Sequence, residues 1–186
     1  MVQRVLEATI NELAVSGYRA FRMDAVSFDA VVNKTTIYRR WPTRASLVVA
    51  AMLWMRRFVH DIPLPDTGSV VDDLVQALLR KVSFKDRVEG QAWAKLLAEK
   101  HDPDVQVIIS DSVRERSAEW DEMITRAIKR RELPKGTDPR LVFGMLGPIA
   151  DAWNMRAGGR LKAEQLEVAV RTVIAGARTG TLVPSR

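Results

Sequence analysis

Apolar residues recur every three to four positions over most of the chain, which is typical of amphipathic α-helices. The pattern predicts a first helix that ends near Gly17, because glycine commonly terminates helices in a left-handed conformation. A short helix over 23–30, a turn over 31–33 and a second short helix over 34–41 are predicted next. Pro42 separates this group from a longer helix, because proline cannot continue a helix from its interior.

The helical pattern resumes after a loop over 61–69 that is rich in proline, acidic and polar residues. The predicted helices beyond the loop occupy residues 71–84, 89–100, 104–132, 138–156 and 163–177. Gly147 and Pro148 lie inside the fourth of them, so we expect a kink there. Since no segment shows sustained strand alternation, the sequence predicts an all-α protein.

The basic residues are concentrated in the N-terminal third of the chain. The 186 residues carry a formal net charge of +6, with a pI near 10.0. Residues 1–60 hold nine Lys or Arg against four Asp or Glu, whereas the rest holds 20 against 19. Attraction to a polyanion would require such a surplus at the binding surface. Charge alone also fits an ordinary basic protein, so it supports nucleic-acid binding only together with a motif.

The composition excludes several classes of function. No cysteine is present, which excludes disulfides, thiolate metal sites and a cysteine nucleophile, and the two histidines lie far apart. The sequence has no glycine-rich phosphate loop and no nucleophile elbow, so we expect no enzyme, no metal and no cofactor. The longest apolar run, over 47–55, is far shorter than the ~20 residues of a membrane-spanning helix. The sequence thus predicts a cytoplasmic protein that does not enter a membrane.

The segment 33–41 has two unlike faces when it is drawn as a helix. Cations and hydroxyls gather on one side, at Lys34, Thr35, Tyr38 and Arg39. Such groups contact phosphates and base edges. Ile37 and Trp41 lie on the other side, where they can be buried. A first short helix, a tight turn and this second short helix together predict a helix-turn-helix.

The same stretch resembles the DNA-binding domain of the tetracycline-repressor-like (TetR) transcriptional regulators. The spacing matches without a gap from Gly17 to Leu47. The matching residues are Gly17-Tyr18, Met23-Asp24-Ala25-Val26, Ala30-Val31-Val32, Asn33-Lys34-Thr35-Thr36-Ile37-Tyr38, Arg39-Arg40-Trp41 and Pro42-Thr43-Arg44. The resemblance implies an N-terminal three-helix helix-turn-helix domain over 1–45, followed by a larger helical ligand-binding and dimerisation domain over 46–186.

The resemblance also implies which residues meet DNA. The candidate DNA-binding residues are Arg22, Asn33, Lys34, Thr35, Thr36, Tyr38, Arg39, Arg40 and Arg44. We expect Arg22, Arg40 and Arg44 to hold phosphates rather than to read bases. Thr36 and Tyr38, taken singly, could equally be plain surface residues, and their place in the motif is what favours a contact with DNA.

Two departures from the family pattern affect the expected geometry. Val31 stands in the turn where the family favours glycine. A left-handed conformation costs an ordinary residue about 1–2 kcal/mol, so we expect a negative φ at Val31. Members also usually carry a basic arm before the first helix, whereas this sequence begins inside that helix. If the sequence is a trimmed form, the phosphate or minor-groove contacts of such an arm are missing from it.

For the C-terminal part, the resemblance implies a two-fold homodimer formed through the last two helices. Apolar stripes on these helices comprise Val142, Met145, Ile149 and Trp153, and Leu166, Val170, Val173 and Ala177. Packing within one chain explains the stripes nearly as well. A second set either packs in the core or lines a pocket for a small apolar or aromatic effector: Trp93, Trp120, Met123, Phe143, Met145 and Trp153. The sequence does not choose among them, so no ligand-binding residue is assigned.

The sequence therefore predicts a sequence-specific DNA-binding transcriptional regulator. The resemblance favours a homodimeric repressor that a small-molecule ligand releases from double-stranded operator DNA. Within this class, an activator and a regulator that ignores ligands stay open. The alternative outside it is a helical protein–protein interaction module without specific DNA binding, which would lack a basic recognition face.

Overall fold

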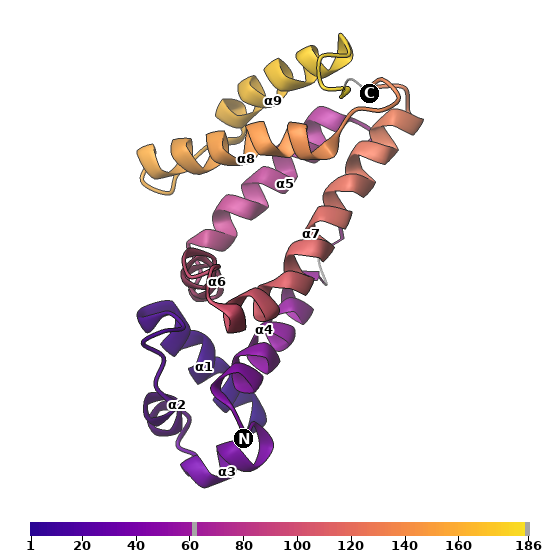
Figure 1. The fold of residues 1–186 in the computed structure, drawn as a ribbon. Helices are drawn as coiled ribbons and strands as arrows, with labels where there is room; N and C mark the ends of the chain where they lie inside the picture. Colours follow the sequence, from indigo (N-terminus) through magenta and orange to yellow (C-terminus); the bar gives the residue numbers. More distant parts are fainter. Residues whose placement is uncertain (61–62, 185–186) are drawn as a thin grey trace. The chain divides into compact units, whose positions relative to one another are not determined.

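The computed structural model describes residues 1–60 and 63–184, without the side chains of residues 56–60, 111–113 and 115–116. Over this part of the chain it contains nine α-helices and no β-strand (Figure 1), which confirms the predicted all-α class. The helices are α1 Val2–Ser16, α2 Met23–Ala30, α3 Lys34–Arg40, α4 Arg44–His60, α5 Val70–Lys85, α6 Val88–Ala98, α7 Pro103–Lys129, α8 Pro139–Arg156 and α9 Ala163–Arg178. Every helix expected from the apolar pattern is present, with its ends shifted by at most a few residues.

The helices form two compact units, each with its own core. The first comprises Met1–Ile62 and Phe84–Val113, and the second comprises Pro63–Ser83 and Arg114–Arg186. Helix α4 begins at Arg44, so the domain boundary proposed after residue 45 falls in its first turn. The division into domains 1–45 and 46–186 stays a prediction, while the first unit as packed extends further along the chain.

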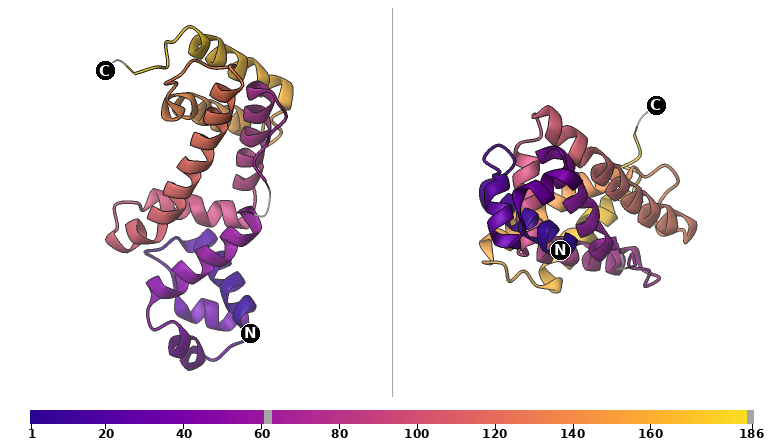
Figure 2. Two further views of the ribbon diagram at one scale, coloured as in Figure 1. Left: turned by 90° about the vertical axis from the view of Figure 1, so that its right-hand side faces the viewer. Right: turned by 90° about the horizontal axis from the view of Figure 1, so that it is seen from below.

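Helix α1 is the centre of the first unit, and α2, α4 and α6 all pack against it. Its buried side chains include Val5, Leu6, Ile10 and Leu13, which recur at the helical period. Helix α3 contacts α2 and lies at the end of the unit away from α6 (Figures 1 and 2). The two short helices are thus carried on a scaffold that includes a helix far along the sequence.

Side-chain caps fix where the helices of the first unit begin. Thr43 and Ser46 cap α4 reciprocally: Thr43 Oγ1 accepts from the amide of Ser46 at 3.0 Å, and Ser46 Oγ accepts from the amide of Thr43 at 3.2 Å. This is the arrangement of a capping box, which satisfies two amides at a helix start. Asn33 caps α3, as the sequence predicts.

In the second unit α8 and α9 pack side by side and contribute to one core (Figure 1). Leu166, Val170 and Ala177 are fully buried in that core. They therefore pack within the chain, which is the second of the two roles that the sequence left open for this stripe. A homodimer formed through the last two helices stays a prediction. Helix α8 runs through Pro148, where the kink expected from proline stays a prediction.

The bulky side chains for which two roles stayed open behave mainly as packing residues. Trp93 is buried in the core of the first unit, and Met123 in the core of the second. The rings of Trp120 and Phe143 lie against each other, with centroids 3.6 Å apart. Met145, by contrast, is 46% exposed on α8.

Neither a membrane span nor a metal site is found in the described part of the chain. Its helices are all too short or too polar to cross a bilayer. Its His, Asp and Glu side chains form no cluster of three or more that could hold a metal ion.

Candidate DNA-binding surface

Helix α3 is held by its apolar side and presents its polar side to solvent. Ile37 is 1% exposed and Trp41, which follows the helix, is 8% exposed, so both are core residues, as predicted. The exposed residues of the helix are Thr35, Tyr38, Arg39 and Arg40. Two cations, a hydroxyl and a phenol are therefore displayed on an element that the core holds in place.

Asn33 shapes the start of α3 rather than standing free on the surface. Its Oδ1 accepts hydrogen bonds from the amide of Thr35 at 3.0 Å and from Thr35 Oγ1 at 2.8 Å. These bonds satisfy an amide that the helix leaves unpaired at its first turn. They also orient the Thr35 hydroxyl, whose lone pairs and the Asn33 NH₂ group can still meet a ligand.

The turn between α2 and α3 differs from the prediction. Val31 adopts a left-handed conformation with φ 53° and ψ 49°, so the expected negative φ is wrong. Its amide donates to the carbonyl of Phe28 at 3.1 Å, and the amide of Val32 donates to that of Ser27 at 3.1 Å. This pair of bonds is the Schellman motif that closes many helices. Ser27 Oγ also donates to the carbonyl of Val32 at 2.7 Å.

These bonds are the physical reason why valine occupies a glycine position. They offset the cost of about 1–2 kcal/mol for a left-handed residue that carries a Cβ atom. The side chain of Val31 is 79% exposed and so meets little steric resistance from the rest of the chain.

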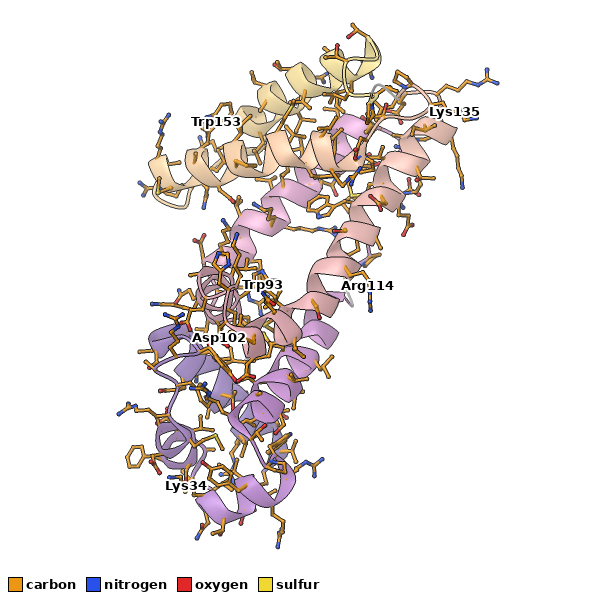
Figure 3. All side chains as sticks on the ribbon, viewed as in Figure 1. Lys34, Trp93, Asp102, Arg114, Lys135 and Trp153 are labelled. Atoms are coloured by element: carbon orange, nitrogen blue, oxygen red, sulfur yellow. The ribbon has the colours of Figure 1, made fainter. Side chains whose placement is uncertain are left out.

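Lys34 bridges the two short helices. Its Nζ lies 2.5 Å from Oδ1 of Asp24, which is in the first turn of α2. The hydrogen bond to Asp24 raises the pKa of Lys34 above its ordinary value, so the ammonium stays charged at any physiological pH. Figure 3 shows Lys34 at the junction of the two helices. The candidate surface therefore contains a carboxylate among its cations.

Arg22 and Arg40 each contact a neighbouring side chain and still expose their guanidinium groups. Arg22 precedes α2, and its Nε lies 3.6 Å from Oε1 of the buried Glu12. Arg40 lies over the ring of Trp41, at 5.4 Å from the centroid. Both side chains are partly ordered by these contacts, which reduces the entropy that a contact with a phosphate would cost.

Arg44 packs on Tyr18 at the start of α4. Its guanidinium lies 4.0 Å from the centroid of the Tyr18 ring, and its Nη1 donates to the carbonyl of Arg19 at 3.5 Å. Tyr18 is buried, and its hydroxyl donates to Oδ2 of Asp104 at 2.7 Å. Burial and this hydrogen bond raise the pKa of Tyr18 to about 12. Arg44 thus makes a cation–π contact with the neutral Tyr18 ring, in addition to its place among the candidate DNA-binding residues.

A carboxylate on the C-terminal side of α6 holds the loop between α1 and α2. Glu99 accepts from the amide of Tyr18 at 3.1 Å and from the amide of Arg19 at 2.8 Å. Gly17 makes room for it: a Cβ at this position would collide with Glu99 Oε1, and the φ of 72° also favours glycine. Gly17, which the sequence predicts as the end of the first helix, is therefore also the point where the backbone comes close to the Glu99 carboxylate.

The candidate residues lie on α3, in the turn before it and at the starts of α2 and α4. The structure also reveals three acidic residues that sequence reasoning did not connect with this surface: Asp24, Glu99 and Asp104. Asp24 is ten residues from Lys34 across a turn, and the helical period gives no pairing over such a turn. Glu99 and Asp104 act from more than 80 residues away, which no local pattern reports.

Two short helices joined by a tight turn, with the second anchored in the core and polar outside, define a helix-turn-helix DNA-binding protein. Known protein families agree with this class. The family model described as "Bacterial regulatory proteins, tetR family" matches residues 5–51. A second, described as "Tetracyclin repressor-like, C-terminal domain", matches residues 64–173. The chain belongs to the TetR family and is a sequence-specific DNA-binding transcriptional regulator.

Individual relatives cover nearly the whole chain. The HTH-type transcriptional regulator AqdR of Rhodococcus erythropolis is 30% identical over 175 residues, which are 94% of this chain and 84% of AqdR. The DNA-binding transcriptional repressor TetR of Mycobacteroides abscessus is 29% identical, over 90% of this chain and 92% of the repressor. The structure of the regulator FadR of Bacillus subtilis in complex with stearoyl-CoA superposes with a TM-score of 0.69. It is 16% identical, over 97% of this chain and 99% of FadR, and so shows the shared fold.

Proposed function

We propose that the protein is a homodimeric repressor that binds operator DNA through α3 of each subunit and is released by a small-molecule ligand. The observation that supports a DNA-binding surface is that the two sides of α3 differ in burial. Ile37 is buried, while Tyr38 and Arg39 on the same helix are exposed. A rigidly anchored helix with an exposed polar face can enter the major groove, where base pairs are distinguishable. The basic surplus of residues 1–60 supplies the attraction to phosphate.

The second subunit is proposed to pack on the exposed faces of α8 and α9. Although Leu166 and Val170 are buried within the chain, the opposite faces of these helices expose apolar and small residues. Among the exposed positions, the apolar and small residues on these faces are Leu141, Gly144, Met145, Pro148 and Met155 on α8, and Val168, Thr172 and Ala175 on α9. Small side chains let helices approach closely, and a two-fold axis would bring the same face of each subunit together.

We propose a small apolar or aromatic effector that binds the helical C-terminal part. FadR of Bacillus subtilis was crystallised in complex with stearoyl-CoA. This supports an effector of apolar character for the present protein. Release from DNA requires that the ligand bind one arrangement of the two α3 helices more tightly than another. A repressor that binds chromosomal operators would act in the cytoplasm.

The test begins with the selection of bound sequences from a random pool of double-stranded DNA. Fluorescence anisotropy on the selected operator then compares the wild type with Tyr38→Ala and Arg39→Ala. We expect each variant to lose at least about fivefold in affinity, because a good base contact is worth roughly 1–3 kcal/mol. Lys100→Ala is the matched control, since it removes an exposed cation just after α6, away from α3.

Three outcomes would contradict the proposal. Equal operator affinity for the wild type and both α3 variants would show that α3 does not read DNA. An affinity that does not fall with salt would exclude a binding surface built on phosphate contacts. Failure to select any sequence would favour the protein–protein interaction module.

A further inference from the structure

The ion pair between Asp24 and Lys34 places a negative charge beside one of the cations of the proposed DNA surface. Asp24 is 79% exposed and Lys34 is 42% exposed, so neither group is forced into the pair by burial. Their atoms are nevertheless 2.5 Å apart. A surface carboxylate repels the phosphates of DNA and lowers affinity for DNA of any sequence. Any contribution of Asp24 to DNA recognition must therefore come through its partner Lys34 and not from attraction to the nucleic acid.

The chemistry of lysine indicates what that action is. An unrestrained lysine is a flexible point charge with three donors, and it neutralises the nearest phosphate irrespective of sequence. When Asp24 accepts one of these donors, the ammonium is fixed between α2 and α3, and two donors remain. Lys34 cannot then reach a phosphate freely unless it leaves Asp24, but its remaining donors can meet an acceptor presented at the junction. In the major groove, O6 and N7 of guanine are such acceptors.

We propose that Asp24 is a positioning residue that directs Lys34 to a guanine edge in the operator instead of to the phosphates. The proposal rests on the proposed operator binding through α3. It adds that Asp24 changes the contact of Lys34 from one with any phosphate to one with a particular base. Asp24 lowers the affinity of the protein for random DNA and increases its discrimination between sequences. Repulsive groups commonly produce specificity in this way.

The chain offers a matched control for the charge of Asp24. Asp29 lies on the same helix and is also exposed, and it takes part in no ion pair among the described residues. Asp24→Asn and Asp29→Asn therefore remove the same charge from the same eight-residue helix. Only the first substitution releases Lys34. Asp24→Glu keeps the charge and can still reach Lys34, so it serves as the conservative variant.

The experiment measures binding of the full-length protein to the selected operator and to a random-sequence duplex, by anisotropy, over a range of salt concentrations. In Asp24→Asn the freed Lys34 neutralises one more phosphate of the random duplex. The plot of log K against log salt should become steeper by about 0.9. A slope difference of about 0.9 amounts to about eightfold tighter binding of random DNA when the salt falls tenfold, from 1 M to 0.1 M. Asp29→Asn should leave the slope unchanged, and Asp24→Glu should behave as the wild type.

Base preference is the second readout, and a role in stability alone would not change it. Selection with the wild type should return a guanine in each half-site whose replacement lowers affinity about fivefold or more, as for a discriminating base contact. The preference should be lost in both Asp24→Asn and Lys34→Gln and kept in Asp29→Asn. In the Lys34→Gln background, Asp24→Asn should have no further effect beyond that of Asp29→Asn.

Several results would overturn the inference. Identical slopes and preferences for Asp24→Asn and Asp29→Asn would reduce Asp24 to an ordinary surface charge. A change of preference that persists when Asp24→Asn is added to Lys34→Gln would show that Asp24 contacts a base itself. Thermal melting of each variant identifies any loss that comes from unfolding. If the wild type selects no sequence at all, the proposed operator binding fails first, and this is distinguishable from a wild type that binds an operator without a guanine preference.

Discussion

Helix α3 and the α8–α9 pair are both amphipathic, yet the faces that they leave exposed differ in kind. On α3 the exposed face carries Thr35, Tyr38, Arg39 and Arg40. On α8 and α9 it carries mainly methionine, valine, leucine and small residues, among them Met145 and Val168. One face can exchange water for phosphates and base edges, whereas the other gains most by excluding water.

The difference shows that a buried stripe alone does not identify the contact surface of a helix. Ile37 on α3 and Leu166 on α9 are equally buried, and both serve the core of their own unit. The partner of each element is indicated by the residues opposite the stripe. A polar and cationic face is proposed to meet DNA, and an apolar face with small residues is proposed to meet a second subunit.

The largest effect is expected from Met145→Asp, which would place two carboxylates in the proposed two-fold interface. A buried, unpaired charge costs several kcal/mol, so the dimer dissociation constant should rise at least about a hundredfold. Sedimentation equilibrium measures the change. Operator affinity should fall with it, while the helix content measured by circular dichroism stays that of the wild type. Val107→Asp, at an exposed position of α7 in the first unit, is the control and should leave the dimer intact. A stable Met145→Asp dimer would remove α8 from the interface.

Ile37→Ala should have the next largest effect, on the stability of the first unit. Removing most of a fully buried isoleucine costs roughly 2–5 kcal/mol, which urea denaturation would measure. Arg39→Ala on the same helix is expected to change stability by no more than about 0.5 kcal/mol while it weakens operator binding. The two variants thus separate the anchoring side of α3 from its reading side. Equal stability of Ile37→Ala and the wild type would show that the anchor is not needed.

The smallest effect is expected at the turn that presents α3. Val31→Gly removes the steric cost of about 1–2 kcal/mol that a left-handed valine carries. Glycine also increases the conformational entropy of the unfolded chain, which opposes this gain, so a net stabilisation of up to about 1 kcal/mol is expected. Val15→Gly, at an exposed position with ordinary helical geometry on α1, should instead destabilise the protein. Thermal melting compares the two. Destabilisation by Val31→Gly as large as that by Val15→Gly would contradict a strained turn.

Local pattern was sufficient to predict the helices, the cap at Asn33 and the burial of Ile37 and Trp41. These features depend on residues within one or two helical turns. The conformation of Val31 could not be predicted because the hydrogen bonds that stabilise it compete with a steric cost of similar size. The same pattern could not tell which residues of α9 meet the chain's own core, because a helical period gives a face but not its partner.

The contacts of Glu99 have a consequence for how the protein is made. The loop at Tyr18 and Arg19 and the core around α1 are completed by residues of Phe84–Val113, so the first unit is discontinuous in sequence. On the ribosome, α1 to α4 emerge before α6 exists. At about 5–20 residues per second, the nascent α3 waits several seconds for the helix that completes its scaffold. Variants that slow or weaken the docking of α6 should therefore lower the yield of folded protein during synthesis more than they lower its stability once it is folded.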